Sequence, residues 1–377
     1  MSETASPPSA GSHEGLEPGV GLCLSGGGYR AMLFHVGALW RLNEAGWLPR
    51  LTRVSSVSGG SITAGVLALS WPRLAFDAAG RSDRFGDEVV APLRGMAART
   101  IDVPAIVRGV LLPGTVADRL AAAYRKHLFG TATLQDLPDD PPRFVFDATN
   151  LQSAALWRFS KPYMRDYRVG EVKAPTVDVA TAVAASSGFP PFLSPVVLTL
   201  RDEDYTPGSG TLQQSPYTTR VMLTDGGVYD NLGLETVWGR CQTVLISDGG
   251  GHIGDQPKPS RLWPLHAYRV LGVIDNQVRS LRKRWAVEEF IAGRTQGTYW
   301  GLRTDIADYE LPSAIACAHD VSMRLAAVPT RLAKMPDDVQ ERLINWGYAV
   351  SDAGLRRHVD STIDPPAGLP YPDAGFG

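Results

Sequence analysis

Residues 54–61, VSSVSGGS, place four serines and two glycines in a stretch of eight residues. A serine nucleophile on a strand-to-helix turn must project from a sharp bend, and the residues two before and two after it must be small. Only Ser58 meets this condition, because Ser56 and Gly60 occupy these positions. Ser58 is therefore the candidate nucleophile. Ser56 replaces the first glycine of the usual G-x-S-x-G pattern, and a purely structural loop would also be rich in serine and glycine.

A second glycine-rich turn, SGGG, follows the apolar run VGLCL and precedes a stretch whose apolar residues have helical spacing. Bare backbone N–H groups at a helix N-terminus favour an anion. Gly26, Gly27 and Gly28 could therefore form the oxyanion hole of an acyl-transfer enzyme. Alternatively, Gly26, Gly28 and Ala31 match the dinucleotide-binding pattern G-x-G-x-x-A.

The dinucleotide alternative predicts an acidic residue at the end of the second strand, where it would bind the ribose. No acidic residue lies between Glu44 and Asp77. Arg50 or Arg53 could hold a 2′-phosphate, so an NADP-binding oxidoreductase stays open as a hypothesis. The second strand runs directly into the serine turn, however, and this favours the oxyanion hole.

A serine hydroxyl needs a base, for which the sequence offers a histidine or a carboxylate. His252, in DGGGHIGD, could complete a triad. Asp225 ends an apolar run and precedes Gly226 and Gly227, which let the backbone turn closely against its neighbours. Asp248 ends the next apolar run in the same way. An aspartate matches the pKa of an alcohol poorly and would need a strongly stabilised oxyanion, and spacing alone does not separate the two aspartates.

Alternating strand and helix patterns must position these turns. Residues 20–71 are typical of a strand-loop-helix-strand-turn-helix unit, which builds a parallel sheet with helices on its faces. Residues 143–150 and two later apolar runs add strands, and functional turns at strand ends are typical of an open α/β sheet. Residues 72–140 contain short helical patterns with proline breaks, which predict a helical insertion or cap.

One catalytic domain is predicted at residues 19–360, between two tails. Residues 1–18 lack the basic and apolar regions of a secretory signal and predict a disordered tail. Residues 361–377 are rich in proline and glycine and predict a second tail. No uncharged apolar run reaches the roughly 18 residues of a transmembrane helix. We therefore expect a cytoplasmic protein whose contact with membranes, if any, is peripheral.

The composition excludes some partners. The chain of 377 residues has 37 basic and 39 acidic residues and a net charge of −2, so no global field favours nucleic acid. Its three cysteines, Cys23, Cys241 and Cys317, have no spacing typical of a metal site. They are expected to be reduced thiols.

Four motifs occur together in this order: LSGGGYRAMLFHVGAL, SSVSGGS, ATAVAASSGFPPFLSPV and TDGGVYDNLG. With this ordered set the chain resembles the patatin-like phospholipase family over most of its length. The resemblance implies a three-layer α/β/α fold with a mostly parallel central sheet. It also implies hydrolysis of acyl esters of phospholipids or lysophospholipids by a Ser-Asp dyad, without histidine, metal or cofactor.

The resemblance also assigns residues. Ser58 corresponds to the nucleophile and Asp225 to the dyad acid, and the oxyanion loop corresponds to Gly26, Gly27 and Gly28. The residues expected to support the site are Arg30, at the family's basic position, and the small turn residues Ser56, Gly60, Gly226 and Gly227. Asp248 lies outside the family pattern and is expected to be structural. The alternative is a non-catalytic or regulated effector that has kept the fold.

Residues 261–285 contain six Lys or Arg residues and one acidic residue, Asp275. One apolar stripe follows a helix here: Ala267, Leu271, Ile274, Val278, Leu281 and Trp285. Arg279, Arg282 and Lys283 lie away from the stripe. Such a helix could lie on an anionic membrane, form a homodimer interface, or pack its stripe into the core and leave the basic residues in solvent.

Overall fold

The computed structural model describes residues 17–105 and 115–377. The predicted N-terminal tail, residues 1–18, lies almost entirely outside the described residues. The described strands form one sheet in the order β10-β9-β1-β2-β3-β4-β5-β6, with β8 also paired to β3 and β7 paired to β8. Five strands run parallel: β10 (Gln296–Gly301), β9 (Cys241–Asp248), β1 (Glu17–Leu24), β2 (Leu51–Val57) and β3 (Arg143–Asn150).

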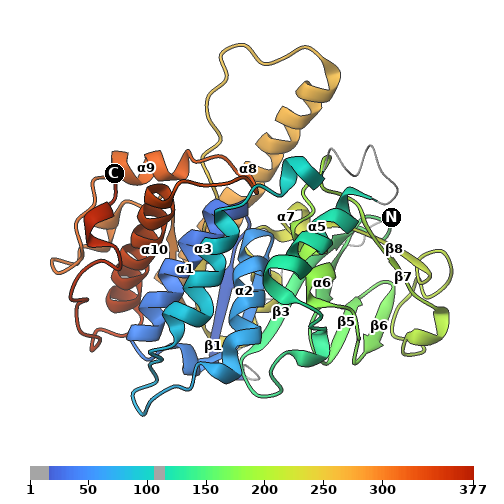
Figure 1. The fold of residues 1–377 in the computed structure, drawn as a ribbon, viewed down its shortest axis with the longest axis horizontal. Coiled ribbons are helices and arrows are strands. Elements are labelled where there is room, and N and C mark those ends of the chain that lie inside the picture. Colours follow the sequence, from blue (N-terminus) through green and yellow to red (C-terminus); the bar gives the residue numbers. More distant parts are fainter. Residues whose placement is uncertain (1–16, 106–114) are drawn as a thin grey trace.

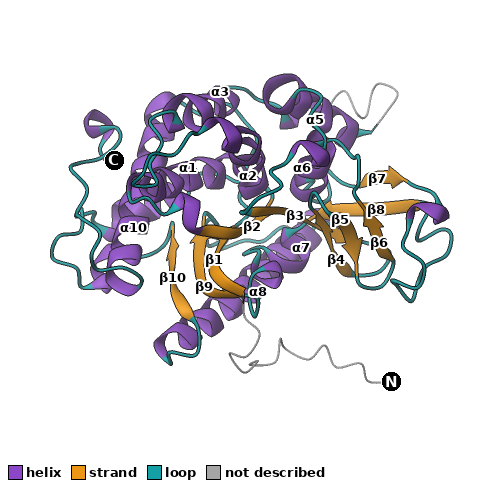
Figure 2. Cartoon of the chain, turned by 90° about the horizontal axis from the view of Figure 1, so that it is seen from below, coloured by secondary structure: helices purple, strands orange, loops and turns teal. Residues whose placement is uncertain are grey.

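The remaining strands extend the sheet in antiparallel fashion beyond β3. They are β4 (Ala155–Phe159), β5 (Tyr163–Asp166), β6 (Gly170–Lys173), β7 (Val196–Thr199) and β8 (Arg220–Asp225). Helices cover both faces of the sheet (Figure 2). The predicted α/β fold is therefore confirmed. Its parallel part carries the glycine loop and the serine turn, while Asp225 ends the antiparallel strand β8.

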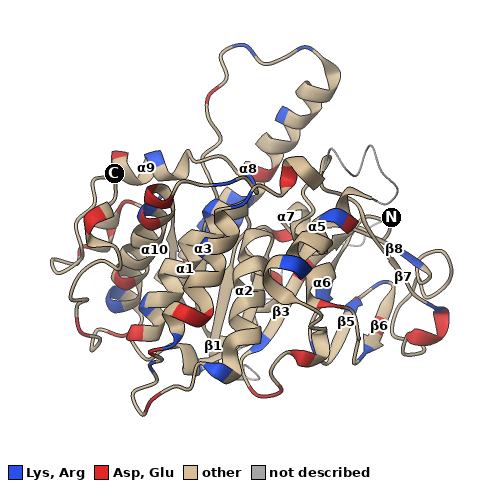
Figure 3. Ribbon diagram, viewed as in Figure 1, with Lys and Arg blue, Asp and Glu red and all other residues tan. Residues whose placement is uncertain are grey.

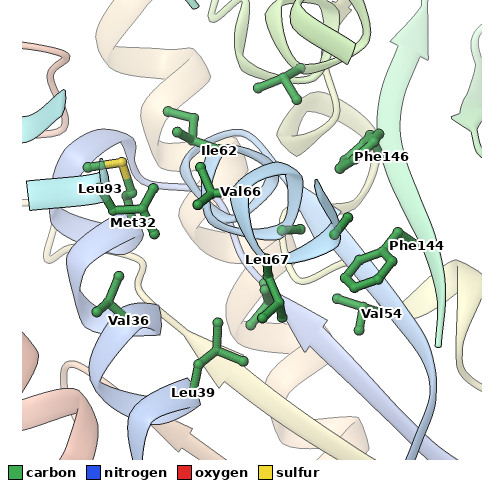
Figure 4. Close-up of a cluster of buried hydrophobic side chains, with 14 of the residues drawn as sticks. Met32, Val36, Leu39, Val54, Ile62, Val66, Leu67, Leu93, Phe144 and Phe146 are labelled. Carbon is green, nitrogen blue, oxygen red and sulfur yellow. The ribbon is translucent and has the colours of Figure 1, made fainter. Parts of the chain in front are cut away.

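Most helices lie on one face of the sheet (Figure 2). They are α1 (Gly28–Glu44), α2 (Gly59–Ser70), α3 (Ala91–Ala97), α5 (Val116–Tyr124), α6 (Val179–Ser187) and α10 (Asp337–His358). The short α9 (His319–Ala326) precedes α10. The main core fills the space between this layer and the strands (Figure 4), with these side chains labelled: Met32, Val36, Leu39, Val54, Ile62, Val66, Leu67, Leu93, Phe144 and Phe146.

The helices α1 and α10 cross in backbone contact. A Cβ atom built on Gly37 would lie 1.9 Å from the carbonyl oxygen of Ile344, and one built on Gly347 would lie 1.9 Å from that of Phe34. Only glycine fits at either position, because a carbonyl of the facing helix occupies the space of a side chain. Since α1 begins at the glycine loop, α10 fixes the helix that carries this loop.

The predicted insertion and C-terminal tail both lie against the body of the protein. Within the described parts of residues 72–140, Leu93 of α3 and Tyr124 of α5 belong to the same core as α1 and α2. Within residues 361–377, the carbonyl of Tyr371 accepts a hydrogen bond of 2.8 Å from the Asn345 side chain on α10. These segments therefore complete the helical layer.

The opposite face of the sheet carries the short α7 (Gly227–Asp230) and the 29-residue α8 (Trp263–Ile291) (Figure 2). The last turns of α8 are anchored, because Trp285 packs on Trp238 with ring centroids 4.4 Å apart and Ala286 is buried. The first turns project away from the body (Figure 1).

The apolar stripe of α8 faces outward from Ala267 to Leu281, and only its last residue, Trp285, packs on the body. Leu271, Ile274 and Leu281 are 55%, 53% and 56% exposed. Arg282, on another side of the helix, faces the body and lies 2.9 Å from a carboxylate oxygen of Glu235. The alternative of a core-packed stripe with solvated basic residues is therefore wrong. Within the described part of the chain, no helix combines the length and the apolar character needed to cross a membrane.

Candidate active site

The pairing of strands along β3 brings the ends of two other strands, β2 and β8, close together. β2 runs parallel to β3 and ends where Val57 pairs with Asp147. β8 runs antiparallel to β3 and ends where Asp225 pairs with Ala148, the next residue of β3. β4 occupies the other edge of β3, so β2 and β8 approach each other along the same edge. The residue after β2, Ser58, therefore meets the end of β8.

Ser58 lies in a strained turn between β2 and α2. Its φ of 53° is in the left-handed region, which costs a residue other than glycine on the order of 1–3 kcal/mol. A Cβ atom on Gly60 would lie 2.3 Å from the carbonyl oxygen of Leu24, which explains the requirement for a small residue there. Ser56 fits in place of the usual glycine because its hydroxyl donates to the carbonyl of Val145 at 3.1 Å.

Asp225 is buried at the end of β8, and its two carboxylate oxygens differ. Oδ1 accepts a hydrogen bond of 2.7 Å from the Gly227 N–H. Oδ2 has no hydrogen-bond partner of normal geometry among the described residues. Burial raises the pKa of Asp225 to about 7, although the Gly227 N–H and the Ser58 hydroxyl favour the ionised form. This carboxyl group is therefore a much better base for an alcohol than an exposed aspartate.

Gly226 and Gly227 allow this turn. A Cβ atom on Gly226 would lie 2.2 Å from the carbonyl oxygen of Asp147, and one on Gly227 would lie 3.0 Å from Oδ1 of Asp225. The backbone of the turn therefore packs directly on β3, as its two glycines suggested.

The glycine loop lies beside Ser58. A Cβ atom on Gly26 would be 3.1 Å from the Cβ of Ser58. The Gly26 N–H itself donates to the carbonyl of Asn231 at 3.1 Å and is therefore not available to an oxyanion. Gly27 and Gly28 have φ values of 147° and 61°, which favour glycine. Their N–H groups have no acceptor within residues 17–105 and 115–377.

The structure adds a donor that the sequence analysis did not name. The N–H of Gly59, the first residue of α2, also has no acceptor in the described chain. A Cβ atom on Gly59 would lie 2.2 Å from the carbonyl oxygen of Gly28, so the two turns touch. The position of Gly59 in the sequence could have indicated this donor, because the residue after the nucleophile supplies an oxyanion donor in strand-turn-helix hydrolases.

Arg30 braces the glycine loop. Its buried guanidinium donates from Nε to the carbonyl of Gly249 at 3.2 Å and also bonds the carbonyl of Val328. Burial lowers the pKa of Arg30 to about 10, so the side chain stays charged at neutral pH. It joins the first turn of α1 to two later loops and does not act on Ser58 directly.

The competing bases have other partners. Both carboxylate oxygens of Asp248 accept hydrogen bonds, one from the Gly250 N–H and the other from the Tyr299 hydroxyl, each at 2.8 Å. His252 is exposed. His35 is buried beneath the glycine loop, where Nε2 lies 2.9 Å from the carbonyl oxygen of Ser25, and burial lowers its pKa to about 4. None of the described histidines hydrogen-bonds to Ser58.

Nothing in the described part of the chain resembles a metal centre: it contains no group of three or more His, Cys, Asp or Glu side chains that could hold a metal ion. The segments that flank Asp225 expose apolar side chains and form the rim of the site. Three of these side chains are substantially exposed: Phe189, Phe192 and Val228. The carbonyl of Gly188, which precedes Phe189, accepts a hydrogen bond of 3.1 Å from the Asp225 N–H.

Comparison with known proteins identifies the family. The patatin-like phospholipase family matches residues 22–238, which is more than half of the chain. The chain therefore belongs to the patatin-like phospholipase family, whose members are lipid acyl hydrolases. No curated protein is detectably similar to it in sequence.

A solved structure of low sequence identity shares the fold. Human GIVD cytosolic phospholipase A2 in complex with methyl gamma-linolenyl fluorophosphonate has a TM-score of 0.50 and 15% identity, over 89% of this chain and 57% of that chain. VipD from Legionella pneumophila has a TM-score of 0.38 and 16% identity, over 91% of this chain and 67% of that chain. The chain spans 43% to 57% of the length of the human phospholipase chains that it matches.

Proposed function

We propose that the protein hydrolyses acyl esters of phospholipids or lysophospholipids with a dyad of Ser58 and Asp225. The observation that carries this proposal is the meeting of β2 and β8 on one edge of β3. A strained serine there lies next to a buried carboxyl group whose Oδ2 accepts no hydrogen bond of normal geometry from the described residues. The family supports a lipid acyl ester as the substrate class, and the apolar rim suits an acyl chain.

In the first half of the reaction, Ser58 attacks the ester carbonyl while Asp225 accepts its proton. The N–H groups of Gly27, Gly28 and Gly59 then stabilise the oxyanion of the tetrahedral intermediate. Collapse of this intermediate breaks the bond to the leaving alcohol, which takes the proton from Asp225, and leaves an acyl-enzyme. Water then hydrolyses the acyl-enzyme with Asp225 again as the base.

A digest of defined lipids tests the substrate class. Wild-type protein incubated with phosphatidylcholine and with lysophosphatidylcholine should release free fatty acid, which mass spectrometry measures. Ser58→Ala is the matched control, because it differs only by the hydroxyl group. Equal release of fatty acid by both proteins would contradict the proposal.

The alternative, a non-catalytic effector with the same fold, predicts a different result with a fluorophosphonate probe. The probe reacts covalently with an activated serine, so we expect it to label the wild-type protein and not Ser58→Ala. A folded scaffold without an activated serine would stay unlabelled.

The rate of ester hydrolysis should rise with pH to a plateau, with a midpoint near 7. Asp225 acts as a base only when ionised, and its pKa is about 7. Below this value kcat/KM should fall about tenfold per pH unit, as expected for a single essential base. Initial rates on a short-chain p-nitrophenyl ester would give the profile, with circular dichroism at each pH to show that the protein stays folded. A plateau that extends down to pH 5 would refute this role for Asp225.

A further inference from the structure

Helix α8 presents exposed apolar side chains that no described part of the chain covers. Besides its outward stripe, Trp263 at its first turn is 80% exposed. The projecting turns carry few charged residues (Figure 3). Contiguous apolar surface of this kind is rare on soluble monomers and marks a site of interaction with a protein or a membrane.

The exposed surface of α8 is continuous with the rim of the candidate site. The rings of Tyr268 on α8 and Phe192 have centroids 6.2 Å apart. Phe192 follows Gly188, whose carbonyl binds the backbone of Asp225. The ring contact between Tyr268 and Phe192 therefore links α8 to the segment that follows the Gly188 carbonyl.

A basic cleft lies at the base of α8, and one of its residues, Arg284, borders the stripe. The cleft has a volume of about 380 Å³ and is lined by four cationic side chains, Arg279, Lys283, Arg284 and Arg303, together with Asp248. Arg279 and Lys283 lie near enough to Asp248 to lower the pKa of its carboxyl group, whereas Arg284 and Arg303 form no ion pair with a carboxylate among the described residues. Arg284 follows Leu281 of the stripe by three residues, so the two lie side by side on the helix.

We propose that α8 docks the protein on a phospholipid surface, with its outward stripe in the outer hydrocarbon and a lipid phosphate in the basic cleft. A helix with apolar and cationic sides lies in this way at the membrane interface. Arginine and lysine are the side chains that bind phosphate, through charge-assisted hydrogen bonds. The proposal complements the proposed function but concerns docking alone, so it does not depend on the reaction at Ser58.

The charge of the cleft favours a lipid surface over a second copy of the chain. A symmetric dimer formed through the stripe would cover the apolar side chains but would leave the basic cleft without an anionic partner. An anionic or zwitterionic lipid surface instead supplies phosphates to the cations and hydrocarbon to the stripe.

Vesicle flotation with the full chain tests the proposal. All variants carry Ser58→Ala, so that binding is measured without turnover and independently of any hydrolysis. Leu271→Glu/Ile274→Glu should weaken binding to vesicles of phosphatidylcholine and phosphatidylserine about tenfold or more, since two apolar side chains no longer enter the hydrocarbon. Arg284→Gln/Arg303→Gln should weaken binding to these vesicles by about tenfold, and binding to pure phosphatidylcholine by less.

The matched control is Gln214→Glu/Gln242→Glu, which adds the same two charges at exposed positions outside α8, and it should bind like the parent. Circular dichroism shows whether each variant is folded. The proposal is overturned if the parent binds no vesicles, or if the stripe variant binds as the parent does. A stripe variant that converts a dimer into a monomer in size-exclusion chromatography, without a change in vesicle binding, would also overturn it. The same holds if inorganic phosphate binds the basic cleft and vesicles do not bind the protein.

Discussion

Ser58→Ala is expected to lower kcat for ester hydrolysis by about 10⁶-fold, the loss found when the nucleophile of a serine hydrolase is removed. The substitution deletes the attacking oxygen and leaves the turn in place. Alanine tolerates the positive φ of this position no better and no worse than serine, so we expect no change in the fold. Initial rates on a short-chain p-nitrophenyl ester measure the effect.

Asp225→Asn should cause a loss of similar size. An asparagine has nearly the same shape, but it cannot accept the serine proton. The control is His252→Ala, since His252 is the base of the competing triad hypothesis and is exposed; this variant should keep full activity. Full activity in Asp225→Asn together with loss of activity in His252→Ala would identify His252 as the base and refute the Ser58–Asp225 dyad.

Gly347→Val is expected to lower the free energy of unfolding by about 3 kcal/mol, at the upper end of the cost of overpacking a core. The added side chain would collide with the carbonyl of Phe34, because α1 and α10 are in backbone contact there. Neither helix can move without disturbing the strands beneath it. The midpoint of urea unfolding measures the change.

Gly95→Ala is the matched control for this prediction. Gly95 also lies within a helix, α3, but a Cβ atom there would have no neighbour within 4 Å. This substitution should raise stability by about 0.5–1 kcal/mol, the difference in helix propensity between the two residues. Equal stability of Gly347→Val and the wild-type protein would show that the two helices separate easily.

Local patterns predicted the strands β1, β2, β3, β8 and β9 and the two glycine-rich turns that follow β1 and β2, because these turns depend on small residues at fixed spacing. Ser58 and Gly60 are examples, since their turn needs no distant partner to be recognised. Three features depend on distant partners and were therefore not predictable. The N–H of Gly26 is taken up by Asn231, the pKa of Asp225 is raised by the core around it, and the stripe of α8 faces solvent. Periodicity shows that a helix has an apolar side, but not which side the rest of the chain covers.

The place of β9 in the sheet has a consequence for fragments of this protein. The family match ends at residue 238, yet β9, which begins at Cys241, pairs with β1 along Glu17–Leu24 and separates it from β10. A fragment cut at the family boundary would leave one edge of β1 unpaired, and the face of α1 that contacts α10 would be uncovered. Such a fragment should accumulate as insoluble aggregates when it is expressed alone.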